Sequence, residues 1–184
     1  VTNAYGLTVV LDNDKVRLAE AGEEADVLGV IRPNDTSAVV GGTQHFKWKD
    51  MPNFMPTKKA DGSPWYSKEA WAEFPLSSKS HWDIPLTIDG AKVHVLASHP
   101  TPPVFDGEEN RNGIRNHDEI RFWADYLTPA NSGYIYDDNA KKGGLAKDAR
   151  FVLLGDQNSS ADGEGDAFNS AISSLYQHPR VNNS

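Results

Sequence analysis

The segment RFVLLGDQNSSADGEGD, residues 150–166, joins a short apolar run to a polar end. Residues 151–154 are apolar and bounded by turn residues, which predicts a buried strand. At Gly155 the backbone is free to turn or to approach a ligand closely. Asp156 and Asn158 offer a carboxylate and an amide, which suit Mg²⁺, phosphate or water. An extended backbone would place both side chains on one side of the chain; the alternative is an Asx-rich turn after the strand.

A second polar strand end occurs upstream, in KVHVLASHPTPP, residues 92–103. Alternating apolar residues predict a strand that Pro100 stops, with His99 displayed beside a loop. A histidine in that position can move protons near neutral pH. For a lone histidine, a structural hydrogen bond in the turn is the ordinary interpretation. Two polar strand ends separated by a helix are more informative together.

The segments around these two strand ends predict an alternation of β and α structure. HWDIPLTI, residues 81–88, forms a strand that Asp89-Gly90 joins to the next one as a hairpin. SPWYSKEAWAEF predicts a short helix capped by Ser67. NHDEIRFWADYL, residues 116–127, predicts a helix with Asn116 and Glu119 as its capping box. Two helix faces should point inward: Ile120, Trp123 and Leu127 on this helix, and Phe168, Ile172 and Leu175 in DAFNSAISSLYQ.

Composition limits the class of protein. The 184 residues include 38% hydrophobic and 24% charged side chains, which is typical of a soluble globular protein. A net charge of −8 argues against a broad basic surface for nucleic acid, but it leaves room for a metal ion that attracts phosphate locally. The absence of cysteine excludes disulfides, zinc–thiolate sites and thiol nucleophiles. No apolar run approaches the ~18 residues of a membrane span.

The chain changes character near Trp48, so we expect two units. Residues 1–47 contain short apolar segments between turns and predict a small all-β meander. Residues 48–184 carry the alternating β and α pattern together with the two polar strand ends. The predicted fold class is therefore mixed α/β (α+β).

The second unit resembles the endonuclease/exonuclease/phosphatase family of metal-dependent phosphoesterases. The resemblance rests on VHVLASH, RNHDEIRFWADYL and FVLLGDQNSS, and it extends to FKWKDMP and LSSKSHWDIPL. Family members have a strand ending in His, a helix, and a strand ending in Gly-Asp-x-Asn; most have Phe where this chain has Gln157. The resemblance implies a β-sandwich-type phosphoesterase core flanked by helices, and a bacterial subgroup that is secreted or periplasmic.

The same resemblance implies roles for individual residues. His99 would be the general acid or electrophile at the scissile phosphate. Asp156 would orient or activate the attacking water near the metal, and Asn158 would hold the phosphate, with both contributing to the metal site. Lys79 and His81 would contact substrate. The cofactor would be Mg²⁺, with Ca²⁺ or Mn²⁺ as alternatives, and the substrate a small phosphoester or a nucleic-acid fragment.

Several family features are missing from this sequence. The family opens with a strand ending in Asn followed by a metal-binding Glu, and it closes with a Ser-Asp-His stretch. Neither pattern is visible between Val1 and Ser184. We therefore expect a metal-dependent phosphoesterase that hydrolyses phosphomonoesters or phosphodiesters by metal-activated water, in an incomplete or inactive form.

Residues 5–42, YGLTVVLDNDKVRLAEAGEEADVLGVIRPNDTSAVVGG, resemble a different family. They are similar to the start of the phage tail-spike intramolecular chaperone domain, called peptidase G2. A competing interpretation keeps one family throughout, with YGLTVVL as a strand ahead of FKWKDMP. The alternative function is then an assembly module of a phage tail fibre, which would be an oligomer. A stable trimer in solution favours that alternative.

Overall fold

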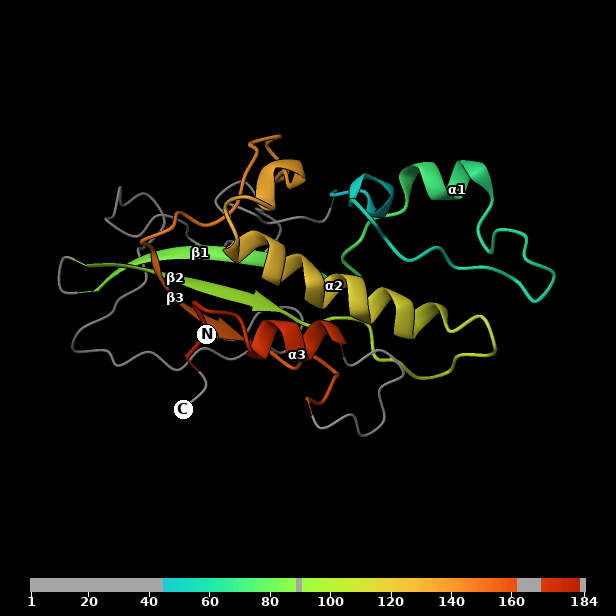
Figure 1. Ribbon diagram of the computed structural model, residues 1–184. Helices are drawn as coiled ribbons and strands as arrows, with labels where there is room; N and C mark the ends of the chain where they lie inside the picture. The colour runs from blue at the N-terminus through green and yellow to red at the C-terminus, as the bar shows by residue number, and fades with distance from the viewer. Residues whose placement is uncertain (1–44, 89–90, 162–169, 183–184) are drawn as a thin grey trace.

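The computed structural model describes residues 45–88, 91–161 and 170–182 of the chain. Within these residues three strands form one mixed sheet and three α-helices accompany it (Figure 1), so the mixed α/β prediction is confirmed. The β meander and the chaperone-like segment lie outside the described residues, except for residues 45–47. None of the helices in the described ranges is long and apolar enough to span a bilayer.

The sheet has the order β1-β2-β3. β1 (His81–Ile88) and β2 (Ala91–Ser98) pair antiparallel, which confirms the predicted hairpin, although its Asp89-Gly90 turn lies outside the described residues. β3 (Arg150–Leu154) pairs with β2 in parallel. Parallel neighbours need a crossover connection, and here that connection contains a long helix.

The helices lie beside the sheet (Figure 1). α2 (Arg111–Leu127) belongs to the crossover between β2 and β3, and α3 (Ser170–Tyr176) packs against it. α1 (Lys68–Glu73) is the predicted short helix, and its cap is confirmed because Ser67 Oγ accepts a hydrogen bond from Ala70 N at 3.1 Å. Two 3₁₀ turns complete the elements, η1 (Trp48–Asp50) and η2 (Ser132–Tyr134).

The predicted start of the long helix is wrong. α2 begins at Arg111, five residues before Asn116, so neither Asn116 nor Glu119 belongs to a capping box. Both side chains are buried inside the helix span and bond to loops far away in the sequence. The local Asn-x-x-Glu pattern matched a cap by spacing alone, whereas long-range partners decide where these two side chains point.

The main core lies between the sheet and the helices. The predicted inward faces are confirmed for Ile120, Trp123 and Leu127 of α2 and for Ile172 and Leu175 of α3, whereas Phe168 lies outside the described residues. Trp123 is only 1% exposed.

The segment FKWKDMP closes one end of this core. Phe46 and Trp48 are both fully buried, and the Phe46 carbonyl accepts from Leu76 N at 2.9 Å. The Trp48 indole Nε1 donates to Asp118 Oδ2 at 2.7 Å. Phe46 therefore contributes to the core of the α/β unit, although it falls before our expected boundary.

The opposite face of the sheet is apolar as well. A second cluster of buried side chains covers it, contributed by β1 and β2: Trp82, Ile84, Leu86, Val95 and Ala97. In the parallel register Val152 and Leu154 of β3 continue this face, and they remain 45% and 40% exposed. The prediction of a strand over residues 151–154 is confirmed, but the prediction that it is buried is wrong, because nothing in the described residues covers this end of the face. A sheet with two apolar faces is typical of a fold with a layer on each side.

Candidate functional site

The carboxyl ends of β2 and β3 bring the two polar strand ends to one edge of the sheet. Ala97 pairs with Leu154 in the last register position of the parallel ladder. His99 and Asp156 each follow that pair by two residues, so both lie just beyond the same edge. His99 is half-buried and Asp156 is exposed, which leaves the carboxylate accessible to solvent.

The backbone after β3 turns sharply instead of continuing as a strand. Gly155 has φ +126°, and a Cβ at this position would overlap the carbonyl oxygen of Ser98. Asn158 adopts a left-handed conformation with φ +50°. Asp156 Oδ1 accepts from Asn158 N at 2.8 Å, which is an Asx turn. The interpretation as a continued extended chain is wrong, because the strand ends at Leu154.

Two asparagine side chains bind the loops after β2 and β3 to each other. Asn158 Nδ2 donates to the Pro100 carbonyl at 3.1 Å. Asn116 Nδ2 donates to the carbonyls of Thr101 and Gln157, at 2.9 Å in each case. Asn116 comes from α2, so the helix that connects the two strands also holds their ends together.

Glu119 forms a second bridge, between the loop before β1 and the loop after β2. Its Oε1 accepts from Ser78 N at 2.6 Å and from Ser78 Oγ at 2.9 Å, and its Oε2 accepts from Thr101 N at 2.6 Å. The side chain is 1% exposed. A buried carboxylate with three donors is well compensated for its lost hydration, so Glu119 organises the loops around His99.

Sequence reasoning missed the role of Asn116 and Glu119, although a signal was present. Helical spacing of three and four residues places them on the same stripe as Ile120 and Trp123, which face the core. Polar residues inside an apolar stripe need partners when they are buried. That conflict indicates long-range hydrogen bonds rather than a helix cap.

His81, expected to contact substrate, is buried in the core with 1% exposure. Its Nε2 lies 2.8 Å from the Glu119 carbonyl and its Nδ1 lies 2.6 Å from Ser77 Oγ. The carbonyl can only accept, so Nε2 carries the hydrogen and Nδ1 accepts from the serine. Burial lowers the pKa of His81, which favours this neutral ring. We therefore leave His81 out of the substrate contacts and regard it as a support for β1.

Lys79 lies at the same edge of the sheet as His99. His81 pairs with Ser98 at the start of β1, and Lys79 precedes His81 by two residues. Lys79 is half-buried and directly follows Ser78, which Glu119 holds. A substrate contact by Lys79 is consistent with this position and stays a prediction.

The donor atoms at this edge suit a cation that keeps most of its water ligands. The exposed Asp156 carboxylate has one oxygen engaged in the Asx turn, and Asn158 adds a neutral amide oxygen. In the described ranges 45–88, 91–161 and 170–182, no group of three or more His, Asp or Glu side chains is placed to hold a metal ion. Mg²⁺ commonly binds through one or two carboxylates, waters and substrate phosphate.

Comparisons of the chain with protein-family models, curated proteins and solved structures found no match.

Proposed function

We propose that the chain is a metal-dependent phosphoester hydrolase whose site lies at the carboxyl edge of the β2–β3 pair. The observation that carries the proposal is the parallel register, in which His99 and Asp156 each follow the Ala97–Leu154 pair by two residues. A carboxylate, an amide and a histidine beside the ends of parallel strands supply part of the donor set that hydrolysis of a phosphoester requires, so the proposal includes an incomplete or inactive member of this class. The substrate class is a phosphomonoester or a phosphodiester.

The side chains in the proposed site divide the steps of hydrolysis among them. His99 protonates or polarises the scissile phosphate, since imidazole is effective near neutral pH. Asp156 orients the attacking water and accepts its proton. Asn158 holds the phosphate with the N–H that its bond to Pro100 leaves available. Asn116 and Glu119 keep the loops that carry these groups in register.

A divalent cation completes the proposal. Asp156 and Asn158 would hold it, with Mg²⁺ as the expected ion and Mn²⁺ or Ca²⁺ as alternatives. When bound, such an ion polarises a phosphoryl oxygen and lowers the pKa of bound water. One carboxylate and one amide oxygen support weak binding, so we expect low affinity without substrate.

We further propose that the domain has a β-sandwich core, in which a second sheet packs against the apolar face of β1 and β2. The face formed by Trp82, Ile84, Val95 and their neighbours is apolar and continues onto the exposed Val152 and Leu154. Apolar side chains on that face favour a second packed sheet. A secreted or periplasmic location also stays part of the proposal, supported by the absence of cysteine and by the resemblance.

Metal binding tests the proposal without depending on turnover. Mn²⁺ broadens the NMR signals of nearby nuclei, so titration of the full chain should broaden the His99 ring and Thr101 amide signals first. Asp156→Asn should abolish this selective broadening. Glu69→Gln is the matched control, because Glu69 is an exposed carboxylate on α1. Uniform broadening that persists in Asp156→Asn would overturn the assignment of the metal to this edge.

A further inference from the structure

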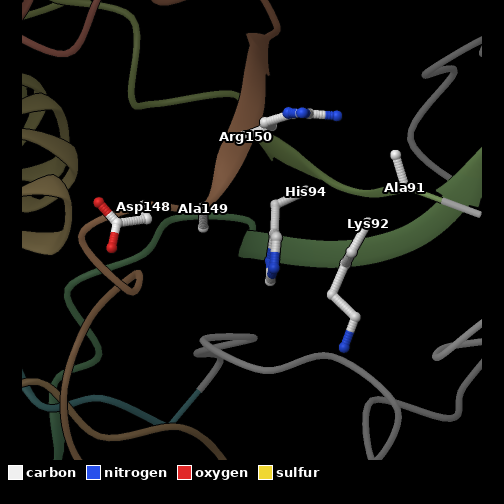
Figure 2. Close-up of a pocket in the computed structure, with 6 residues that line it drawn as sticks. All are labelled: Ala91, Lys92, His94, Asp148, Ala149 and Arg150. Atoms are coloured by element: carbon white, nitrogen blue, oxygen red, sulfur yellow. The ribbon is translucent and has the colours of Figure 1, made fainter.

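A second site candidate lies at the other end of β2, around a cavity of about 380 Å³. The cavity is lined by residues from the starts of β2 and β3: Ala91, Lys92, His94, Asp148, Ala149 and Arg150 (Figure 2). At ~3.3 Å per residue, His94 lies about 17 Å along the strand from His99. The cavity is therefore separate from the proposed hydrolytic edge.

His94 is held in one orientation by a buried chain of hydrogen bonds. Its Nδ1 lies 2.6 Å from Asp83 Oδ1, and the Tyr126 hydroxyl donates to Asp83 Oδ2. Asp83 is 1% exposed, and burial raises the pKa of Tyr126, so the hydroxyl keeps its proton. A carboxylate only accepts, hence Nδ1 carries a hydrogen and Nε2 is the ring nitrogen left to meet a ligand.

Two positively charged side chains, Lys92 and Arg150, line the cavity together with His94. Figure 2 shows Lys92 and His94 pointing to the same side of β2, as residues two apart on a strand do. Their side chains start about 7 Å apart, a separation that one oxyanion can bridge. Arg150 pairs with Val93 and so leaves β3 on the opposite face of the sheet, and Figure 2 shows its side chain directed away from Lys92 and His94. Asp148 is the acidic group among the lining residues.

The wall of the cavity is anchored by a third cation. Arg180 Nη2 donates to the carbonyls of Ala146 and Ala149, at 2.9 and 3.1 Å. Its guanidinium also lies 5.4 Å from the centre of the Phe151 ring. Ala149 lines the cavity, and its position is therefore set by bonds to the C-terminal segment rather than by the local turn alone.

We propose that this cavity binds a small oxyanion, such as a phosphate or carboxylate group, between the Lys92 ammonium and His94 in its imidazolium form, in which Nε2 also carries a hydrogen and donates to the anion. On a chain of net charge −8, the lining combines Lys92 and Arg150 with a single carboxylate, Asp148. Lys92 and the His94 imidazolium, whose charge Asp83 balances from the buried side, attract anions locally on a protein that otherwise repels them. Asp83 already holds the imidazole in one orientation, so binding loses little side-chain entropy and the affinity is higher.

The test uses inorganic phosphate, and then acetate, added to the full chain at constant pH and ionic strength. The His94 ring signals, assigned with His94→Gln, are followed by NMR. We expect a saturable shift, with Lys92→Gln weakening binding by about tenfold, the order expected for one lost charge-assisted hydrogen bond. Arg150→Gln should weaken it less, because Arg150 points to the other side. Lys58→Gln, an exposed charge elsewhere, should leave it unchanged.

The relative affinities for phosphate and acetate identify the class of ligand, and two other outcomes would overturn the proposal. Tighter binding of phosphate than of acetate assigns the cavity to phosphate groups, and the reverse order assigns it to carboxylates. A shift that rises linearly without saturation overturns the proposal. An equal affinity in Lys92→Gln and Lys58→Gln overturns it too, because Lys92 is exposed and its replacement leaves the fold intact.

Discussion

Asn158 donates its side-chain amide to the carbonyl oxygen of Pro100 over 3.1 Å, across 58 residues of sequence. The bond joins the loop that follows β3 to the loop that follows β2. Since Asp156 lies two residues before Asn158 and His99 immediately precedes Pro100, this contact ties together the two parts of the proposed site.

Replacing Gly155 by Ala should separate the ends of β2 and β3. Gly155 has φ +126°, and an added Cβ would overlap the Ser98 carbonyl. Gly62→Ala is the matched control, because Gly62 has φ +82° but open space around it. A non-glycine residue at positive φ costs about 1–2 kcal/mol at either position. The overlap with Ser98 comes in addition, so urea unfolding should show at least ~1 kcal/mol more destabilisation for Gly155→Ala than for Gly62→Ala. Equal losses would show that the close approach to Ser98 relaxes freely.

Replacing Glu119 by Gln should loosen two loops at once. Glutamine keeps one acceptor oxygen but presents an NH₂ group to a backbone donor. Ser78 N or Thr101 N then loses its partner, at a cost of about 1–3 kcal/mol. Hydrogen exchange of both amides should accelerate in Glu119→Gln and stay unchanged in Glu69→Gln. Unaltered protection of Thr101 would contradict the bridging role of Glu119.

Replacing Trp123 by Ala should remove a central part of the core. The indole is 1% exposed, and its Nε1 donates to Ser98 Oγ at 2.8 Å. Truncation of a large buried aromatic costs about 3–5 kcal/mol. Trp65→Ala should cost below about 1 kcal/mol, because Trp65 is 36% exposed. A loss below about 1 kcal/mol for Trp123→Ala, measured by urea unfolding, would mean that α2 packs differently.

The pH dependence of stability should report His81. Burial lowers its pKa in the folded state from the ordinary value of 6.5. Below pH 6.5 the unfolded chain takes up a proton that the folded chain refuses, so the free energy of unfolding falls as pH decreases toward the folded pKa. The slope is at most about 1.4 kcal/mol per pH unit. Above pH 6.5 this contribution is constant.

Urea unfolding between pH 7.5 and 5 measures this slope in wild type and in His81→Gln. The slope should decrease in the variant even if its overall stability is lower. The slope is also measured in His178→Gln. Burial and the nearby Arg180 lower the pKa of His178 as well, but this side chain is more exposed than His81, so we expect a smaller decrease in the slope. An identical slope in wild type and His81→Gln would rule out His81 as the source.

We predict weak or no phosphoesterase activity for the 184-residue chain with Mg²⁺ or Mn²⁺. In the described residues the proposed edge offers His99 and Asp156, without a group of three or more metal-binding side chains. Metal-assisted hydrolysis needs a metal, a base and an acid in one place, and it loses most of its acceleration when one is missing.

Hydrolysis of bis-(p-nitrophenyl) phosphate and p-nitrophenyl phosphate, with and without EDTA, measures this activity. Robust metal-dependent turnover that disappears in Asp156→Ala and His99→Ala would show that the site is complete. Turnover that persists unchanged in both variants would remove these residues from the site.

The sequence by itself determined the elements and their buried sides. The apolar alternation around Val95 and the helical stripe of Ile120, Trp123 and Leu127 are local patterns, whereas the apolar run before Gly155 predicted a strand but not its partial exposure. Local periodicity decides which side of a strand or helix avoids water, so these predictions needed no knowledge of the partner element. The cap of α1 is predictable from the sequence because Ser67 accepts its hydrogen bond from Ala70, only three residues further along the chain.

Only the tertiary structure decided how the polar groups are used. The parallel pairing of β2 with β3 brings His99 and Asp156 to one edge, while Asn116 and Glu119 lie inside a helix that starts earlier than their spacing suggests. The two histidines of the predicted site also differ in burial, since the His81 side chain lies in the core and His99 is half-buried beside the edge. The bonds of Asn116, Glu119 and His81 reach partners between 15 and 41 residues away, and the paired strands β2 and β3 lie farther apart still in the sequence. A buried polar group is stable only where the fold supplies such partners, and a short window of sequence does not contain them.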